Sequence, residues 1–460
     1  MRIGEYFFST DTEKSTLHRR ITPTQEQRDQ QTKRWNDLCD YLKGDLGEKT
    51  DAPMYSWLQG SYKMGTQIRP VSKSEEFDID LGIYFSWPGN PEDNFGAKYL
   101  KSLVQKSIES YADEAGEGVY ADLVPKKRCA RIHYPGGFHI DVPTYHVDME
   151  RDARSLATEA DLWEESDPKK LYVWFRSNFT EDTDTQVQRI IRYLKMYFAL
   201  HINGDAPSSI LITVLATEAY TLLPDAELTS DDTALRHVAA KIAERLETDI
   251  KVPNPVNTEE NLNRLNDDAN NSFVEQLWRL VDLGDRALAS DSQFETVAIW
   301  IEAFQHFFPS PIPDNNDSAV TAIIPVDFIP IVDVRAISKT NAQAVYTGTD
   351  RIGPIPRQCN IKFTLRNANQ LPVGARVHWI VRNEGQEAEL TNDMGHPAGE
   401  GPVGRDENSA YLGTHFMDVT IFSQFGTVLG FKRLPVKIHG LVVPLRNPKK
   451  PGYLRFKKKR

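Results

Sequence analysis

Alternating apolar and polar positions predict strands in the first third of the chain. The run F-D-I-D-L at 77–81 alternates apolar and acidic side chains, and the apolar stretch at 83–85 extends it as far as Trp87-Pro88. Residues i and i+2 of a strand share a face, so Asp78 and Asp80 are expected to project together. Two further strand-like runs are separated by Pro135-Gly136-Gly137, which predicts a hairpin of 128–134 with 138–145.

Helical spacing of apolar residues dominates the middle of the chain. Thr22-Pro23 is a good helix start, because threonine caps well and proline suits the first helical position. Gly284 is expected to end one of the later helices. The predicted helices are 23–43, 97–112, 185–202, 208–222, 235–247, 273–283 and 295–307.

Prolines and β-rich runs change the pattern after the last predicted helix. Residues 309–349 are interpreted as a proline-containing linker, and strand-like runs follow at 360–365, 375–381, 416–422 and 428–431. We therefore predict an α+β protein. Its expected parts are a mixed α/β lobe at 1–160, a helical lobe at 161–308, the linker, and a small all-β sandwich with a basic tail at 350–460.

Length and composition limit the number of domains, the expected location and the cysteine chemistry. The 460 residues suit two to three domains, and the net charge of −11 conceals a basic segment after Arg357 with about nine more basic than acidic residues. We find no apolar run of membrane-spanning length and no signal peptide, so we expect a cytoplasmic protein without membrane contact. The three cysteines, Cys39, Cys129 and Cys359, offer neither a disulfide framework nor a zinc knuckle.

The strongest chemical signal lies between residues 60 and 80. Gly60-Ser61 and the nearby Gly65-Thr66 form a short loop whose N–H groups and hydroxyls suit a bound anion. Paired carboxylates repel one another unless a hard cation lies between them. A third acid, Asp141, is flanked by Ile140 and Val142, where an unpaired charge is costly. Three convergent carboxylates suit two Mg²⁺ ions and in-line nucleotidyl transfer.

These motifs carry a family resemblance. G-S followed by D-x-D and a third strand-borne acid resembles the DNA polymerase β-like nucleotidyltransferases. The longer run from Q-G-S-Y-K-M-G-T to E-F-D-I-D-L resembles the bacterial CD-NTases, the cGAS/DncV-like synthases of CBASS anti-phage systems. The resemblance implies a polymerase β-like lobe whose cleft is completed by the helical lobe.

The resemblance also implies roles for individual residues. Asp78 and Asp80 would bind two Mg²⁺ ions, for which Mn²⁺ can substitute, and Asp141 would serve the attacking hydroxyl. Gly60 and Ser61 would contact the phosphates. Lys195, in a predicted helix, would reach the donor triphosphate, with Ser208 or Ser209 at the start of the next helix as its partner.

Other candidates have less support from the sequence. Thr66 is expected to line the loop, and Arg69 to pair with a nearby acid. A zinc site at His133, His139 and His146 is rejected because no cysteine pair accompanies them.

The C-terminal part resembles the AGS-C sensor domain fused to many CD-NTases, through V-H-W-I-V-R-N-E-G at 377–385 and Y-L-G-T-H at 411–415. The tail at 449–460 interleaves basic residues with Tyr453 and Phe456. This composition suits either nucleic-acid binding or a solubilising disordered end. A nucleic-acid or protein activator at this domain is therefore a hypothesis.

The predicted function is synthesis of a cyclic di- or trinucleotide from ATP or other NTPs, with release of pyrophosphate. The resemblance implies that the product activates a downstream effector in anti-phage defence. One alternative is a linear 2′-5′ oligoadenylate synthase or a nucleotidyl-transferring toxin, since the three acids do not select the acceptor. Another is a nucleic-acid sensor with a vestigial transferase, which the intact Asp78, Asp80 and Asp141 disfavour.

Overall fold

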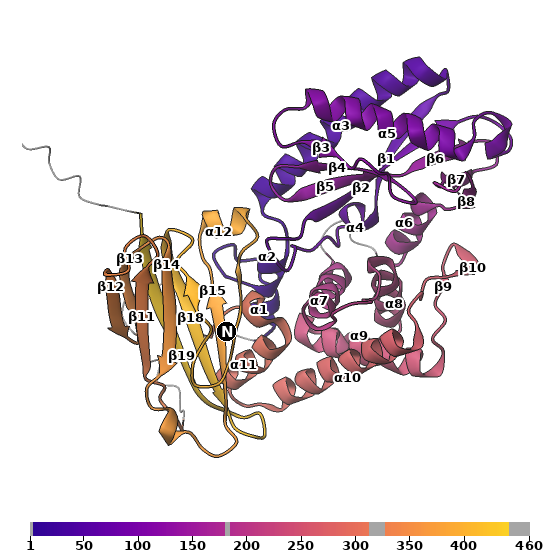
Figure 1. Ribbon diagram of the computed structural model, residues 1–460. Coiled ribbons are helices and arrows are strands. Elements are labelled where there is room, and N and C mark those ends of the chain that lie inside the picture. The colour runs from indigo at the N-terminus through magenta and orange to yellow at the C-terminus, as the bar shows by residue number, and fades with distance from the viewer. Residues whose placement is uncertain (1–2, 180–184, 312–326, 441–460) are drawn as a thin grey trace, which may run out of the picture. The chain divides into compact units, whose positions relative to one another are not determined.

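The computed structural model describes residues 3–179, 185–311 and 327–440 (Figure 1). The chain divides into two compact units: unit 1 comprises residues 1–310 with 390–393, and unit 2 comprises 311–389 with 394–460. Unit 1 combines a mixed sheet with helices, and unit 2 is built mainly of strands, which gives the α+β class that the sequence predicts. The basic tail at 449–460 lies outside the described residues.

The sheet of unit 1 has the strand order β3-β4-β5-β2-β6-β7-β8, and β1 also pairs with β2. The central strand β2 runs parallel to β5 and β6 and antiparallel to β1. Pro143 separates β5 from β6, where the hairpin prediction had one continuous strand. The strands are β1 (Met54–Gln59), β2 (Phe77–Ser86), β3 (Tyr120–Ala121), β4 (Ala130–Tyr134), β5 (Phe138–Val142), β6 (Thr144–Asp148), β7 (Ala153–Ala157) and β8 (Trp163–Glu165).

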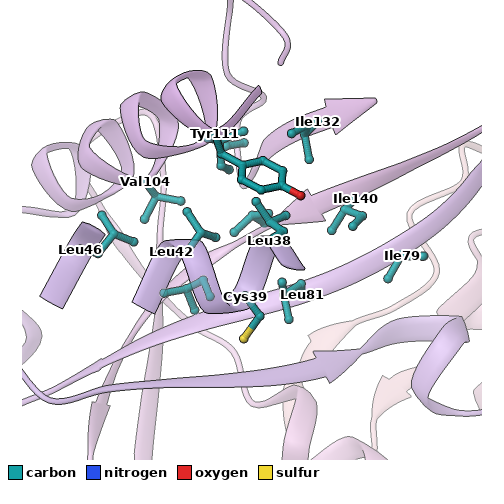
Figure 2. Packing of buried hydrophobic residues seen from close by; sticks show 14 of the residues in the cluster. Leu38, Cys39, Leu42, Leu46, Ile79, Leu81, Val104, Tyr111, Ile132 and Ile140 are labelled. Atoms are coloured by element: carbon teal, nitrogen blue, oxygen red, sulfur yellow. The ribbon is translucent and has the colours of Figure 1, made fainter. Parts of the chain in front are cut away.

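Period-two alternation decides which side chains of the sheet are buried. Ile79 and Leu81 of β2 and Ile140 of β5 point into one core, together with Leu38 and Leu42 of helix α3 (Gln25–Thr50) (Figure 2). Helix α5 (Ala97–Glu114) lies beside α3 on this face of the sheet (Figure 1). The intervening residues of β2, β4 and β5 therefore project from the opposite face, which is where the polar candidates lie.

Helix α3 begins after Thr24, whereas the sequence predicts a start after Thr22. Thr24 caps the helix, its hydroxyl accepting from Gln27 N at 3.2 Å, while Gln27 Oε1 accepts from Thr24 N at 2.9 Å. This reciprocal capping box satisfies two N–H groups that lack helical partners, which the predicted Thr22-Pro23 start does not do.

The remainder of unit 1 is mainly helical. Gly284 does not end a helix as predicted but lies inside α10, where a Cβ would come within 2.7 Å of Arg236 Cγ on α9. The glycine therefore permits close packing of these two helices. The elements are α1 (Gly4–Phe7), α2 (Leu17–Ile21), α4 (Gly60–Lys63), α6 (Pro168–Ser177), α7 (Gln186–His201), α8 (Ser209–Thr221), α9 (Asp231–Thr248), β9 (Pro253–Asn254), β10 (Asn257–Asn261), α10 (Asp267–Ala289) and α11 (Gln293–Phe304).

Unit 2 is a sandwich of two sheets, with orders β12-β11-β14-β17 and β13-β19-β18-β15-β16. Its core includes Phe363, Trp379 and Val419. The strands are β11 (Val332–Ser338), β12 (Val345–Thr349), β13 (Ile352–Pro356), β14 (Cys359–Leu365), β15 (Arg376–Arg382), β16 (Gly395–Glu400), β17 (Glu407–Asn408), β18 (Gly413–Phe422) and β19 (Val428–His439), and the short helix α12 is Gln386–Leu390.

The predicted linker at 309–349 is wrong over its second half. Residues 312–326 lie outside the described residues, but β11 and β12 are strands of the sandwich. Val332, Val334 and Ala336 alternate into the core of unit 2, a period-two pattern that the neighbouring prolines obscured in the sequence.

Within the described part of the chain, no helix combines the length and apolar character needed to cross a bilayer.

Candidate active site

Strand register brings four functional side chains into a compact group. In the parallel pair β2–β5, Asp78 lies opposite His139, and Asp80 lies opposite Asp141. Each strand contributes residues i and i+2, so all four project from the sheet face that is opposite the helix-covered core. Asp78 is the most exposed of them, with 51% of its side chain accessible, and His139 is buried.

Arg131 binds Asp141, the third predicted acid. This residue lies opposite Asp141 on β4, and its guanidinium binds both carboxylate oxygens, with Nη2 at 2.8 Å from Oδ2. Burial alone raises the pKa of Asp141, but Arg131 outweighs it and holds the pKa below its ordinary value. Asp141 is therefore an ionised carboxylate at neutral pH.

The pKa of Asp80 is shifted in the opposite direction. Its pKa lies well above the ordinary value, first because the carboxylate is surrounded by protein and then because Asp78 and Asp141 repel a further negative charge. Arg131 and Lys195 compensate only in part. A divalent cation between these carboxylates removes the repulsion, so the donor set fits the predicted metal.

Glu76 is a site residue that sequence reasoning missed. Its Oε2 lies 2.9 Å from His139 Nδ1 and 2.8 Å from His133 Nδ1, and the second nitrogen of His133 lies 3.0 Å from Asp122 Oδ1. The signal was present in E-F-D-I-D, where Glu76, Asp78 and Asp80 follow the same alternation. Of the three histidines examined in the sequence, His133 and His139 join this group.

The third histidine lies apart from the acids. His146 is buried, and its Nε2 lies 2.9 Å from the backbone oxygen of Trp87.

The predicted phosphate loop lies against Asp80. Gly60 begins α4 with φ +61°, and a Cβ at this position would lie 1.9 Å from Asp80 Oδ2. Ser61 follows in the same helical turn, which is closed by Thr66 N donating to Ser61 O at 2.9 Å. Glycine at this position therefore allows the backbone to approach the carboxylate closely.

Lys195 reaches the same loop from α7. Its Nζ donates to Thr66 Oγ1 at 3.1 Å and to Thr66 O at 3.3 Å. Burial, aided by Arg192, lowers the pKa of Lys195 to about 7, although Asp80 and Asp78 oppose this shift. Gln188, in the first turn of α7, donates to Met64 O at 2.8 Å and so attaches the helix to the loop.

Thr66 and Arg69, the two candidates with less support from the sequence, have different partners. Thr66 is buried in the loop and binds Lys195, while buried Arg69 donates to Thr22 O at 3.4 Å.

A cavity of about 780 Å³ adjoins these groups. Among the predicted residues, it is lined by Gly60, Ser61, Asp78, Asp80, Lys195, Ser208 and Ser209. Ser208 Oγ is used as the cap of α8, accepting from Leu211 N at 3.3 Å. Basic residues also line the same cavity. The sequence did not single them out, because they come from a strand, a helix and loops far apart in the chain: Arg128, Arg151, Arg154, Lys170 and Arg264.

Two family models match parts of this chain. The family model for the nucleotidyltransferase domain of cyclic GMP-AMP synthase DncV-like proteins matches residues 54–145. The model for the adenylyl/guanylyl and SMODS C-terminal sensor domain matches residues 315–439.

One curated relative matches nearly the whole chain, and another matches less than half of it. A cyclic GMP-AMP synthase of Escherichia albertii is 27% identical over 97% of this chain and 97% of its own length. A c-di-GMP synthase of Roseivirga ehrenbergii is 27% identical, covering 44% of this chain and 59% of that protein.

Solved structures share the fold. Vibrio cholerae DncV cyclic AMP-GMP synthase superposes with a TM-score of 0.54 at 20% identity, covering 64% of this chain and 95% of its own. The 3′-deoxy GTP-bound form of Escherichia coli DncV gives 0.54 at 20% identity, covering 66% and 96%. The chain is thus a nucleotidyltransferase whose residues 54–145 are similar to the nucleotidyltransferase domain of cyclic GMP-AMP synthase DncV-like proteins and whose residues 315–439 are similar to the adenylyl/guanylyl and SMODS C-terminal sensor domain.

Proposed function

We propose that this protein makes a cyclic di- or trinucleotide from ATP or other nucleoside triphosphates and releases pyrophosphate. The observation that carries the proposal is the cross-strand group of Asp78, Asp80 and Asp141 beside the Gly60 loop and Lys195. Both of the curated relatives named above are cyclic-dinucleotide synthases, which favours a cyclic product over a linear one.

The donor nucleotide is held by its phosphates. Gly60 lets backbone N–H groups approach them, and Ser61 adds a hydroxyl donor. Lys195 exchanges its contact with Thr66 for a phosphate oxygen, and Ser209, at the start of α8, lies on the same cavity. Ser208 contributes through the helix start that it caps.

Asp78, Asp80 and Asp141 would hold two Mg²⁺ ions, with Mn²⁺ as a substitute. When bound, the ions neutralise the triphosphate and acidify the attacking hydroxyl. Asp141, kept ionised by Arg131, accepts the proton of that hydroxyl. The new bond joins the hydroxyl oxygen to the α-phosphorus, and the bond to pyrophosphate breaks. The last transfer, the second for a dinucleotide and the third for a trinucleotide, takes place within the linear intermediate, releases its pyrophosphate and closes the ring.

The biological role that we propose is anti-phage defence. The cyclic product would act on a downstream effector, and the C-terminal domain would receive the activating signal from a nucleic acid or a protein. Support for this part comes from the match to the sensor-domain family.

The test is product analysis. The purified chain is incubated with labelled NTPs and Mg²⁺ or Mn²⁺, treated with phosphatase and examined by mass spectrometry, beside an Asp78→Ala/Asp80→Ala control. We expect a phosphatase-resistant product that the control lacks, with a mass that gives ring size and bases.

A linear product identifies a different acceptor, because its terminal phosphates are removed by phosphatase. Absence of any product, also with RNA, DNA or candidate proteins added, combined with retained nucleic-acid binding, would favour the vestigial sensor instead.

A further inference from the structure

The two ring nitrogens of His139 face acceptors on opposite sides. The side chain is only 7% exposed, and Nδ1 lies 2.9 Å from Glu76 Oε2. Because a carboxylate oxygen only accepts, Nδ1 carries the ring proton of a neutral imidazole. Nε2 then presents a lone pair 3.0 Å from Asp78 Oδ1, without the alignment of a hydrogen bond, and is a buried nitrogen with no hydrogen-bond partner among the described residues.

Two lone pairs at this separation need a positive charge between them, which is either a proton on Nε2 or a metal ion. His139 Nε2 and carboxylate oxygens of Asp78 and Asp141 lie within 4.8 Å of one another, which is the spacing of ligands around one ion. We propose that His139 is a nitrogen ligand of a divalent ion that it shares with Asp78 and Asp141. This inference rests on the proposed function, and it adds a ligand that the three-aspartate pattern does not contain.

Glu76 completes the arrangement behind the ring. Metal-bound histidines commonly donate their other N–H to a carboxylate, which fixes the tautomer and makes the ligand more basic. Glu76 also lies 2.8 Å from His133 Nδ1, and His133 stacks on Tyr120 with ring centroids 4.6 Å apart. Glu76 and His133 are therefore positioning residues, because they act on the ion only through His139.

The nitrogen ligand changes the expected metal preference. Mg²⁺ is a hard ion that takes oxygen ligands, whereas the transition metal Mn²⁺ accepts an imidazole nitrogen more readily than Mg²⁺ does. We therefore expect Mn²⁺ to bind more tightly than Mg²⁺. We also expect His139→Gln to lower Mn²⁺ affinity about tenfold while changing Mg²⁺ affinity less than threefold.

The experiment is pulsed electron paramagnetic resonance of substoichiometric Mn²⁺ on the full chain. Inorganic tripolyphosphate replaces nucleotide, because it supplies phosphate without nitrogen. We expect coupling to a directly bound ¹⁴N nucleus that disappears in His139→Gln and persists in the matched control His133→Gln. The control removes a histidine that binds the same Glu76 but does not face Asp78.

Bound Mn²⁺ with only oxygen ligands would overturn this inference and leave the proposed function intact; it would mean that a proton, not a metal, lies between His139 and Asp78. Failure of Mn²⁺ to bind, in the wild type as in Asp78→Ala/Asp80→Ala, would instead reject the metal site itself. If His139→Gln does not fold, wild-type protein labelled with ¹⁵N-histidine decides the question, because a spectrum unchanged by the label contradicts histidine ligation.

Discussion

Individual charges in the cleft are set by their neighbours and not by residue type. Asp141 is held ionised by Arg131, whereas Asp80, which lies opposite it on β2, is disfavoured as an anion. Lys195 is disfavoured as a cation by burial. In the function that we propose, each imbalance would be relieved by a ligand of opposite charge, a metal ion for Asp80 and a triphosphate for Lys195.

Lys195 gives nucleotide binding a pH dependence. Its pKa of about 7 means that the free protein loses this positive charge as the pH rises through 7, and phosphate restores the charge on binding. Nucleotide affinity should therefore fall between pH 7 and pH 9. Lys195→Met should weaken binding about 10- to 100-fold at pH 6.5, the loss of a hydrogen bond to a charged group, and should flatten this decline.

Calorimetric titration of a non-hydrolysable ATP analogue across pH measures both effects. Lys63→Met serves as the control, since Lys63 lies 4.5 Å from the ring of Trp57 and is exposed to solvent in part. An unchanged pH profile in Lys195→Met would contradict the assignment.

Asp80→Asn should stabilise the metal-free protein while removing activity. The pKa of Asp80 is raised in the folded state. Its favourable contribution to the free energy of unfolding is therefore present below the unfolded pKa near 4 and is lost as the pH rises through the folded-state pKa. We expect a gain of about 1 kcal/mol at pH 7.5, or about 2–4 °C in Tm, which vanishes at pH 4. Thermal unfolding in EDTA at the two pH values measures this gain in stability. A lower Tm of Asp80→Asn at pH 7.5 would show that the charged carboxylate does not destabilise the fold.

At the level of elements, the proposed site depends on the helical turn that follows β1, at the start of the segment that leads to β2. Helix α4 begins at Gly60 directly against Asp80, and α7 is attached to the following loop through Gln188 and Lys195. The turn thus connects the strand that carries the acids with the helix that carries the cation.

Gly60→Ala should damage activity more than stability. A Cβ would meet Asp80 Oδ2 and displace it, and misplacement of a catalytic group by about 1 Å costs about 100-fold in rate. Gly116→Ala is the matched control, because Gly116 also has positive φ (+103°) but nothing within 4 Å of an added Cβ. Both substitutions should cost about 1–2 kcal/mol in backbone strain.

Initial rates and urea unfolding of the two variants separate strain from steric conflict. Equal losses of activity in Gly60→Ala and Gly116→Ala would mean that the contact with Asp80 is not what matters.

At the level of the whole molecule, the chain has separate hydrophobic cores in its two units. In unit 1, Asp231 of α9 binds Arg189 through both oxygens at 2.7 and 2.9 Å and also accepts from Tyr193. In unit 2, Trp379 is buried in the sandwich and donates to Gly401 O at 2.8 Å.

Substitutions in the two units should shift different unfolding transitions. Asp231→Ala removes the carboxylate that binds Arg189 and Tyr193, and Trp379→Ala opens a cavity, each at a cost of about 3–5 kcal/mol. Scanning calorimetry should show one transition lowered by Asp231→Ala and the other by Trp379→Ala. Equal lowering of a single transition by both variants would show that the chain unfolds as one cooperative unit.

The sequence predicted the features that depend on residues close together in the chain. The alternation at 77–81 assigned β2 and the face of its two aspartates, and the apolar spacing at 185–202 located α7. Local patterns failed where distant packing prevailed. Gly284 remains helical because α9 packs against it, and the strands at 332–349 were hidden by the nearby prolines.

The sequence by itself determined the α+β class, the loop and acids that mark the nucleotidyltransferase, and the resemblance of the C-terminal part to a sensor domain. Only the tertiary structure placed Arg131 beside Asp141, His139 beside Asp78, and the buried Lys195 on the loop at Thr66. The physical reason is register. Pairing between strands far apart in sequence depends on the packed core, and a slip of one residue in a strand would turn its side chains, such as Arg131 or His139, to the opposite face. Lys195 is placed instead by the packing of α7.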